Sequence, residues 1–491
     1  MRICNNGSRH SGRIFRIAHK IIAGKCPCPM FSHKLFNYFN LNQDKINANI
    51  INMNLNFSRS KNGLGFILML GCVCCLGVLL RAADRYVVEP GTIADGNGGI
   101  YTSWDIAATQ IQWAVAAAES NTTIWVSNGT YVLTNQVATV YGTNITIRSV
   151  NGRAVTIVDG NREITSNRCF DLYTNATLDG FTVRNGCATN GSGGGGGIRA
   201  NNSKVYNCRI ENNVSTNADG AGINAQSSRC LVTNCQIIGN VITGAAGAGV
   251  YAVAGASISS CEIASNRSLG TIYGVGVRLR SGSIVSNCII YANTATNSST
   301  EIYGGGVCTY ESSIVRNSLI YGNRVTSGGG GIWVFAIEGS SYEPKIQSCT
   351  VVSNYSSGSG AGIRISGYYH NTTYVENTIS YYNTGNADSN LYYHPAHSGL
   401  YVIANSCIAP TSAILANISI NTGNIQSNPG FVNWSNGNYR LKVDSPCVNA
   451  GTNQSWMTNA YDLGGAQRIR YGTVDMGAFE RVNQGTVYTV H

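Results

Sequence analysis

Apolar and polar residues alternate with a period of two in short segments that recur along the chain. In "NCRIENN", residues 207–213, Cys208 and Ile210 fall on one side of an extended strand, and Arg209 and Glu211 fall on the other. Equivalent segments lie at 234–240, 260–266, 287–293, 317–323, 348–354 and 377–383, with looser copies at 180–186 and 405–409. Each segment is too short for an amphipathic helix, so the pattern predicts a repeated β-strand.

A second pattern, Gly-x-Gly followed by an apolar residue, repeats in phase with the first. Its copies begin at Gly195, Gly220, Gly247, Gly274, Gly304, Gly329 and Gly360. Self-similarity at steps of 25 to 31 residues is typical of a solenoid. Because Gly and Asn turns leave no room for a helix in each repeat, we predict an all-β fold. Each repeat would be one coil of about three strands in a parallel β-helix with about 9–12 coils.

Each recurring residue type has a structural role in such a coil. Gly-x-Gly permits positive φ and close backbone approach at a corner, while the inward Cys and Ile positions stack into a core. An asparagine ladder is predicted, in which amides hydrogen-bond from coil to coil and Asn accommodates the left-handed turn. Its members are Asn213, Asn240, Asn266, Asn293, Asn323, Asn354 and Asn383. Cys208, Cys235, Cys261 and Cys288 are expected to be small core residues, because a regular ladder disfavours the disulfide torsion.

The N-terminal end of the repeats has a different pattern. Residues 103–120 place apolar side chains at helical spacing, with Ser103 as a candidate N-cap. Residues 123–133 then alternate as a strand pair. We therefore predict one amphipathic helix that caps the open end of the core.

The chain begins with a basic leader. Residues 1–83 hold eleven Lys and Arg against one acidic residue, Asp44, whereas the rest holds 22 basic and 22 acidic residues. The apolar stretch 63–80, between basic residues and Arg81-Ala82-Ala83, is typical of a secretory signal peptide. An uncleaved membrane anchor or lipoprotein processing at Cys72 remains open. The neutral body gives no reason to expect nucleic-acid binding, and a membrane partner is expected only through residues 63–80.

The cysteine pattern excludes some chemistry. Eleven cysteines follow the leader, an odd number, and no CxxC pair occurs among them. Neither a complete disulfide framework nor a zinc site is therefore predicted.

The coils resemble the right-handed parallel β-helix proteins of the pectin-lyase-like superfamily. The opening "YVVEPGTIADGNGG", followed by "IQWAVAAA" and "IWVSNGTYVL", is similar to the start of secreted bacterial members. The C-terminal part is similar to the choice-of-anchor Q module. The matching elements are Ser445-Pro446, Asn449-Ala450-Gly451, Asp462, Gly464, Gly465, Arg468, Asp475, Gly477, Ala478 and Glu480. Because no apolar segment or basic tail follows Glu480, we expect secretion over C-terminal anchoring.

These observations divide the chain into five parts. Residues 1–83 are the leader, and 84–165 are the N-terminal cap and first coils. Residues 166–415 are the β-helix repeats, 416–480 are the choice-of-anchor Q-like module, and 481–491 are a tail.

The superfamily includes polysaccharide lyases and hydrolases, whose active sites need particular acidic and basic residues. Two carboxylates in fixed register would serve hydrolysis, and clustered acids with a base would serve calcium-assisted elimination. The acids of the coils do not stack in register; they are Asp171, Asp179, Glu211, Asp219, Glu262, Glu301, Glu311, Glu338, Glu343 and Glu376. We expect loop positions for the three histidines of the body, His370, His394 and His397. The loop 95–99 lacks the bidentate Glu of a calcium site. No catalytic residue, metal site or cofactor is predicted.

One outward column is more suggestive. The residues directly after each Gly-x-Gly-apolar unit, and those two positions further on, include many Arg and aromatic side chains. The candidates for glycan binding are Arg199, Tyr251, Arg278, Arg280, Tyr310, Trp333, Phe335 and Arg364. Rings stack on sugars and guanidinium groups form bidentate hydrogen bonds, so such a column suits a long glycan. A solvated strand face on which β-propensity favours aromatics explains the same pattern.

Three functions follow from these observations. The first is a secreted or cell-surface β-helix protein that binds extracellular polysaccharide or acts as an adhesive rod. The second is a polysaccharide lyase or glycoside hydrolase, and the third is a purely structural envelope protein. Carboxylates facing the Arg and aromatic column would favour the enzyme.

Overall fold

The computed structural model describes residues 82–92, 99–139, 142–270, 272–295, 302–336, 341–367, 371–386, 388–394, 399–408 and 420–482. These belong to the unit Arg81–His491. Several predictions lie outside the described residues: the leader 1–81, residues 95–98, Glu301, Glu338, His370 and His397. None of the helices in the described ranges has the length and apolar character needed to cross a membrane.

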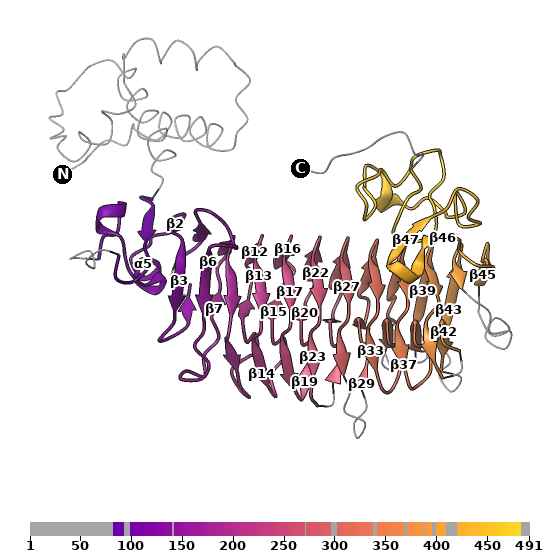
Figure 1. Cartoon of the computed structure of the whole chain (residues 1–491), viewed down its shortest axis with the longest axis horizontal. Coiled ribbons are helices and arrows are strands. Elements are labelled where there is room, and N and C mark those ends of the chain that lie inside the picture. Colours follow the sequence, from indigo (N-terminus) through magenta and orange to yellow (C-terminus); the bar gives the residue numbers. More distant parts are fainter. Residues whose placement is uncertain are drawn as a thin grey trace, which may run out of the picture. The chain divides into compact units, whose positions relative to one another are not determined.

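The chain winds through parallel sheets A, B and C in turn, and from β10 onward each coil adds a short strand of sheet D between B and C. Figure 1 shows the successive coils stacked side by side. Sheet A contains β1 Arg85–Val87, β2 Thr123–Val126, β5 Thr146–Ser149, β8 Thr177–Asp179, β12 Lys204–Tyr206, β16 Leu231–Thr233, β21 Ser257–Ser259, β26 Ile284–Ser286, β31 Ile314–Arg316, β35 Lys345–Gln347, β39 Thr372–Glu376, β43 Leu400–Ala404 and β45 Ile420–Thr422. Sheet B contains β3 Gly129–Val132, β6 Thr156–Asp159, β9 Thr182–Arg184, β13 Arg209–Glu211, β17 Gln236–Ile238, β22 Glu262–Ala264, β27 Ile289–Tyr291, β32 Leu319–Tyr321, β36 Thr350–Val352, β40 Ile379–Tyr381 and β44 Cys407–Ile408.

The third side of the coil is sheet C. It contains β4 Val137–Ala138, β7 Phe170–Leu172, β11 Ile198–Ala200, β15 Ile223–Gln226, β20 Val250–Val253, β25 Val277–Leu279, β30 Val307–Tyr310, β34 Ile332–Ala336, β38 Ile363–Gly367 and β42 Leu391–Tyr393. The prediction of an all-β parallel solenoid is confirmed, with about ten turns.

Two short sheets lie between B and C, so many coils have more than the three strands that were predicted. Sheet D contains β10 Cys187–Ala188, β14 Val214–Thr216, β18 Val241–Thr243, β23 Arg267–Ser268, β28 Thr294–Ala295, β33 Arg324–Val325, β37 Tyr355–Ser356 and β41 Thr384–Gly385. Sheet E contains β19 Ala245–Ala246, β24 Ile272–Tyr273 and β29 Ile302–Tyr303. The middle coils therefore carry four or five strands, because the stretch before each Gly-x-Gly is itself extended.

The N-terminal cap is shorter than predicted. Helix α5 spans only Ile111–Ala116, after a 3-10 turn, η3, at Trp104–Ile106. Ser103 makes no side-chain capping bond, and Ala108 forms a parallel bridge with Val87, which interrupts the expected helix with extended backbone. Ile111, Ala114 and Val115 still face the core, so the capping role is confirmed. Residues 123–133 form two strands as predicted, but these lie on successive sides of a coil and do not pair.

The core is the stack of inward residues predicted from the alternation. Cys208 and Ile210 are fully buried, and the equivalent residues of neighbouring coils stack on them. Cys235, Cys261 and Cys288 continue the column, and all are free thiols. Burial raises the pKa of Cys208, Cys235 and Cys261 well above the ordinary range, so these thiols serve packing.

The Gly-x-Gly corners behave as predicted. Gly195 and its equivalents at positions 220, 247, 274, 304, 329 and 360 have positive φ. The second glycine excludes a side chain for another reason. A Cβ on Gly249 would lie 2.4 Å from the Gly276 carbonyl oxygen and 2.9 Å from Asn266 Nδ2.

The predicted hydrogen bonds of the asparagine ladder are confirmed, but the prediction that the ladder residues themselves have left-handed backbone conformation is wrong. Asn240 Nδ2 donates to Asn266 Oδ1 at 3.0 Å, and this bond repeats from Asn213 to Asn383. The left-handed residue is not the ladder Asn but the one before it. The φ values there are 54° at Asn212, 66° at Gly239, 55° at Ser265, 52° at Ala292, 62° at Gly322, 55° at Ser353 and 54° at Tyr382. The turn residue points out of the coil, and the next Asn can then bury its amide.

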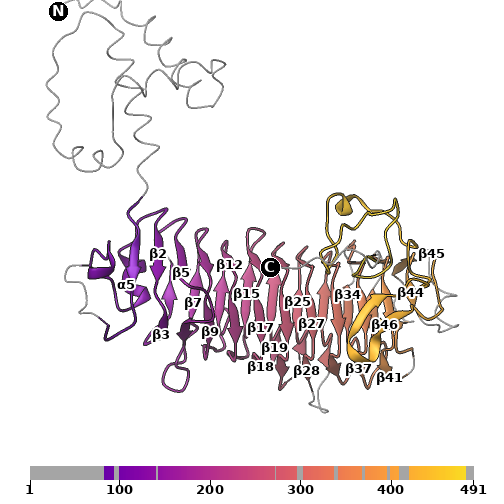
Figure 2. The ribbon, with the colours of Figure 1, turned by 45° about the horizontal axis from the view of Figure 1, so that its top comes forward.

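Residues 428–480, called the C-terminal segment, pack against the outer face of sheet B. The segment contains the antiparallel hairpin of β46 Phe431–Asn433 and β47 Asn438–Leu441, and the 3-10 turns η4 Trp434–Asn436 and η5 Ser455–Met457. Its apolar side chains Phe431, Leu441 and Met476 contact Leu319 and Ile379 of sheet B. Figures 1 and 2 show the segment, in yellow, beside the last coils.

Candidate functional site

The predicted outward column forms one register along sheet C. Tyr251 lies opposite Arg278, which lies opposite Cys308, and the column continues through Trp333, Arg364 and Tyr392. Tyr310 and Phe335 are paired in the same way, two positions further along their strands. The repeat phase read from the glycines therefore located these side chains correctly.

The column is not a solvated strand face. Tyr251, Arg278 and Trp333 point away from the core, yet only 8%, 7% and 5% of their surfaces are exposed. The expectation that they face open solvent is wrong, because side chains from the corner between sheets D and C fold over them.

Two tyrosines that the sequence reasoning missed cover the column. Tyr303 stacks on Trp333 with 4.4 Å between ring centroids, and Tyr273 stacks on the same indole at 5.4 Å. Both tyrosines end strands of sheet E. The signal was an Ile-Tyr pair directly before Gly274 and again before Gly304.

Arginines lie between these rings. The Arg278 guanidinium lies 4.7 Å from the Tyr273 centroid and 5.1 Å from that of Tyr310. Arg280 also lies over Tyr310, at 4.7 Å. Such contacts hold guanidinium groups in place and leave their edges available for hydrogen bonding.

The far end of the column has the same composition. Arg364 lies over both Tyr303 and Tyr392, at 5.4 and 5.1 Å, and Phe335 packs against Tyr310 at 5.2 Å. We call this whole set the aromatic–arginine patch. It consists of Tyr251, Tyr273, Arg278, Arg280, Tyr303, Tyr310, Trp333, Phe335, Arg364 and Tyr392.

Arg199, the remaining predicted residue, is separate from the patch. Its Nε donates to Asp171 Oδ1 at 2.7 Å, and its guanidinium also contacts the Tyr173 hydroxyl. Arg168 donates to the same carboxylate at 3.0 Å. Asn224 lies between Arg199 and Tyr251 in the register, so this local ion-pair cluster is a distinct feature of the first coils.

Two carboxylates accompany the arginines. Glu311 lies 3.4 Å from Arg280 and accepts a hydrogen bond from Ser281 at 2.5 Å. Burial raises the pKa of Asp219, although the charges of Arg278 and Arg280 and a hydrogen bond from the Ala246 amide oppose the shift. Burial alone would lower the pKa of Arg280, but Tyr251 and Glu311 raise it overall.

Part of the hydrogen-bonding capacity of the patch is unused. The Nε atoms of Arg278, Arg280 and Arg364 are buried and have no hydrogen-bond partner within the described part of the chain. Across the same residues, no group of three or more His, Cys, Asp or Glu side chains is placed to hold a metal ion. The patch is therefore a surface of rings and cations.

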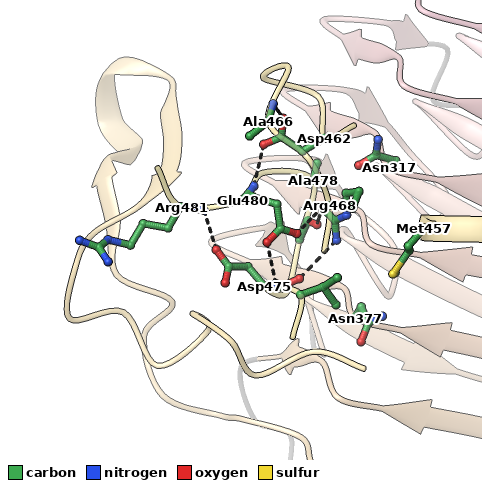
Figure 3. A network of polar contacts seen from close by, with 12 residues as sticks. Asn317, Asn377, Met457, Asp462, Ala466, Arg468, Asp475, Ala478, Glu480 and Arg481 are labelled. Atoms are coloured by element: carbon green, nitrogen blue, oxygen red, sulfur yellow. Dashed lines mark hydrogen bonds and ion pairs between the residues drawn. The ribbon is translucent and has the colours of Figure 1, made fainter. Parts of the chain in front are cut away.

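A second polar network lies in the C-terminal segment, on the residues that match the choice-of-anchor Q pattern (Figure 3). Arg468 is fully buried, and its Nη1 lies 3.2 Å from Glu480 Oε1 and 3.0 Å from the Gly477 carbonyl oxygen. Glu480 accepts from the Asp475 amide at 3.0 Å, and the Glu480 amide donates to Asp462 at 2.7 Å.

Burial sets the charge balance of this network. It raises the pKa of Asp462 and Asp475, and it raises that of Glu480 to about 8 against the opposing charge of Arg468. It also lowers the pKa of Arg468. Because the ion pair and its hydrogen bonds are internal to the segment, the network holds the fold of the segment together.

The segment is joined to the coils by backbone and side-chain hydrogen bonds. The Ala478 amide donates to Thr350 Oγ1 at 3.0 Å, and the Gly477 amide donates to the Asn377 carbonyl at 2.7 Å. Asn317 Nδ2 donates to the Tyr461 carbonyl at 2.8 Å. The sequence motif thus positions backbone groups against sheet B.

Comparison with known proteins supports the fold. The family described as "Right handed beta helix region" matches residues 236–443, which is less than half of the chain. Together with the strand topology, this match makes the coils a right-handed parallel β-helix. No curated protein sequence matches the chain.

Several solved structures are similar at low identity. Pectate lyase Pel9A has 15% identity and a TM-score of 0.44, with 81% of this chain and 97% of that chain covered. The pectin methylesterase from Aspergillus niger has 16% identity and a TM-score of 0.34, with 57% and 87% covered. A rhamnogalacturonan lyase has 12% identity and a TM-score of 0.34, with 66% and 87% covered. Likenesses this slight have no bearing on the activity of the chain.

Proposed function

We propose that the protein is exported and binds an extracellular polysaccharide along the aromatic–arginine patch. The observation that carries the proposal is the continuous run of rings and guanidinium groups over the strands from β20 to β42. Six strands at about 4.8 Å spacing span roughly 24 Å, which suits several consecutive sugar units.

The chemistry of the patch favours acidic sugars. Part-exposed faces of Tyr310, Phe335 and Tyr392 offer stacking surfaces for sugar rings. Arg364 is half-buried and forms no ion pair with a described carboxylate, so its accessible edge can bind a uronate carboxylate.

Affinity electrophoresis in polygalacturonate, alginate or neutral dextran gels tests the proposal. We expect the mobility of the purified protein to fall in at least one acidic gel, and less so at high salt. The double variant Y310A/F335A and the single variant R280Q should each reduce this retardation several-fold. Y206A/Y374A, which removes two outward tyrosines of sheet A, is the matched control. Equal mobility in all gels would overturn binding and favour a purely structural envelope protein.

Breakdown of the same polysaccharide is the second candidate, favoured by Asp219. A half-buried carboxyl whose pKa is raised near two arginines has the properties of a general acid or base. If the protein is a lyase or hydrolase, it should release unsaturated or reducing ends from the polysaccharide it binds. D219N should abolish that release and leave gel retardation unchanged, while absence of product from the unaltered protein rejects this candidate.

Export and surface association are further parts of the proposal. Residues 63–80 support a signal peptide, and the C-terminal segment supports the resemblance to the choice-of-anchor Q module. N-terminal sequencing of the protein from the culture medium should begin near Asp84. A product that stays in the membrane fraction with residues 63–80 intact would instead identify an anchor.

A further inference from the structure

Two cysteines meet where the C-terminal segment packs on the last coil. Cys407 begins β44 and continues the outward column of sheet B, directly after Ile379. Cys447 lies in the C-terminal segment. Both side chains are fully buried, in one apolar cluster with Phe431, Leu441 and Met476.

The two thiols lie close together. Both side chains belong to one buried apolar cluster, the neighbouring Cys447 thiol raises the pKa of Cys407, and the Cys407 thiol donates to the Ser427 carbonyl oxygen at 3.3 Å. Cys447 is held on both sides of its Cα: its amide donates to Ser445 Oγ at 3.1 Å, and its carbonyl accepts from the Met476 amide at 3.0 Å. The thiols therefore approach from opposite segments whose backbones are fixed.

The cysteine column in the core provides a contrast. Cys208 and Cys235 are also in contact, but they precede parallel, in-register strands and point the same way into the core. A disulfide needs a torsion near 90° about its S–S bond, which side chains stacked in parallel rarely reach. Cys407 points outward and Cys447 points back toward it, so this pair is free of that restriction.

We propose that Cys407 and Cys447 form a disulfide that fastens the C-terminal segment to the last coil. The oxidant is a small disulfide such as oxidised glutathione, which acts before the segment has closed over the coil. One cysteine thiolate attacks it, forms a mixed disulfide and releases one reduced glutathione. The second cysteine thiolate then displaces the other glutathione. Two thiol protons leave, and two electrons pass to the oxidant.

Peptide mapping of the full chain tests the pairing without a variant. The protein is refolded with reduced and oxidised glutathione, its remaining thiols are blocked with a maleimide in denaturant, which exposes the buried core cysteines, and it is digested without reductant. We expect one cross-linked peptide pair containing Cys407 and Cys447, while Cys208, Cys235, Cys261 and Cys288 carry maleimide. Maleimide on both Cys407 and Cys447, or either residue joined to another cysteine, would overturn the proposal.

Limited proteolysis tests the fastening role. Oxidation should slow cleavage within residues 428–480 by roughly tenfold or more, because a cross-link across about 40 residues removes much of the freedom of the released segment. C447S should abolish this response, whereas the core variant C235S should retain it. An oxidised protein that is cleaved as fast as the reduced one would overturn the role. Mapping and proteolysis use no polysaccharide, so their failure is distinct from a failure of glycan binding.

Discussion

The outer faces of sheets B and C follow the same alternation but have different neighbours. On sheet B the outward column is polar in the coils of Arg209, Gln236 and Glu262, and it becomes mostly apolar from Ile289 and Leu319 onward. The apolar part is the part that the C-terminal segment covers. On sheet C the column keeps many arginines and rings, and among the described residues those that cover it come from its own corner.

The difference shows how outward residues of a solenoid distinguish its faces. A covered face needs apolar residues, because a buried polar group without a partner is costly. A face that no other segment covers can keep cations and rings, since such side chains pack their apolar parts while their polar ends reach water. Substitutions on the covered face of sheet B should therefore change the stability of the C-terminal segment, whereas substitutions on sheet C should change retardation in polysaccharide gels.

The largest effect is expected inside the C-terminal segment. Arg468→Met removes the charged hydrogen bonds to the Gly477 and Asp475 carbonyl oxygens and the contact with Glu480, and should destabilise the segment by about 3–5 kcal/mol. Hydrogen exchange of residues 462–480 measures this loss, and R470M, at a half-buried arginine that no described ion pair involves, is the control. Unchanged protection in R468M would show that the network does not hold the segment.

A charge beneath the segment should release it. Ile379→Asp places a carboxylate among Phe431, Leu441 and Met476, at a cost of about 3 kcal/mol. The segment should become protease-sensitive while the coils stay folded by circular dichroism. Gln236→Asp lies in the same column beyond the covered region and should leave cleavage unchanged. Equal effects of the two variants would remove the distinction between the covered and open parts of sheet B.

The segment should be less stable in alkaline solution. Unfolded Glu480 loses its proton near its ordinary pKa, whereas folded Glu480 keeps it until about pH 8. The unfolding free energy therefore falls as pH rises from about 5 to 8, by about 3 kcal/mol. Hydrogen exchange at several pH values, corrected for intrinsic exchange, should show this slope, and E480Q should flatten it. The absence of a slope between pH 5 and 8 would mean that Arg468 keeps Glu480 ionised in the folded protein.

The smallest effect is expected at the patch. Tyr303→Ala removes the ring stacked on Trp333 and should cost about 1 kcal/mol in urea unfolding. Its effect on retardation in acidic polysaccharide gels should be larger than that of Y206A, which changes sheet A alone. A loss of several kcal/mol would instead identify the patch as part of the fold.

Much of the fold was predictable from local pattern. Gly195, Ile198, Cys208 and Asn213 each take the role that their repetition indicated, because neighbouring coils share one backbone path. The capping helix was overestimated, since Ala108 pairs with Val87 of the first coil instead of continuing a helix. The left-handed residue of each turn was predicted one position too late, because Asn suits both the left-handed turn and the ladder.

The candidate site was predictable only in part. Register along sheet C followed from the repeat, so Tyr251, Arg278 and Trp333 were correctly aligned. Their burial did not follow, because Tyr273 and Tyr303 reach over them from another sheet. Contacts between sheets depend on how far each corner loop projects from the coil. The alternation of residues within a strand contains no information about that distance.

The repeat by itself determined the solenoid, its inward core and the ladder, because each coil packs on nearly identical neighbours and local spacing is enough to set the contacts. Only the tertiary structure decided which outward face is covered and where Cys407 meets Cys447. Residues 428–480 have no periodicity, and their position depends on an apolar stretch of sheet B that comes from many separate coils.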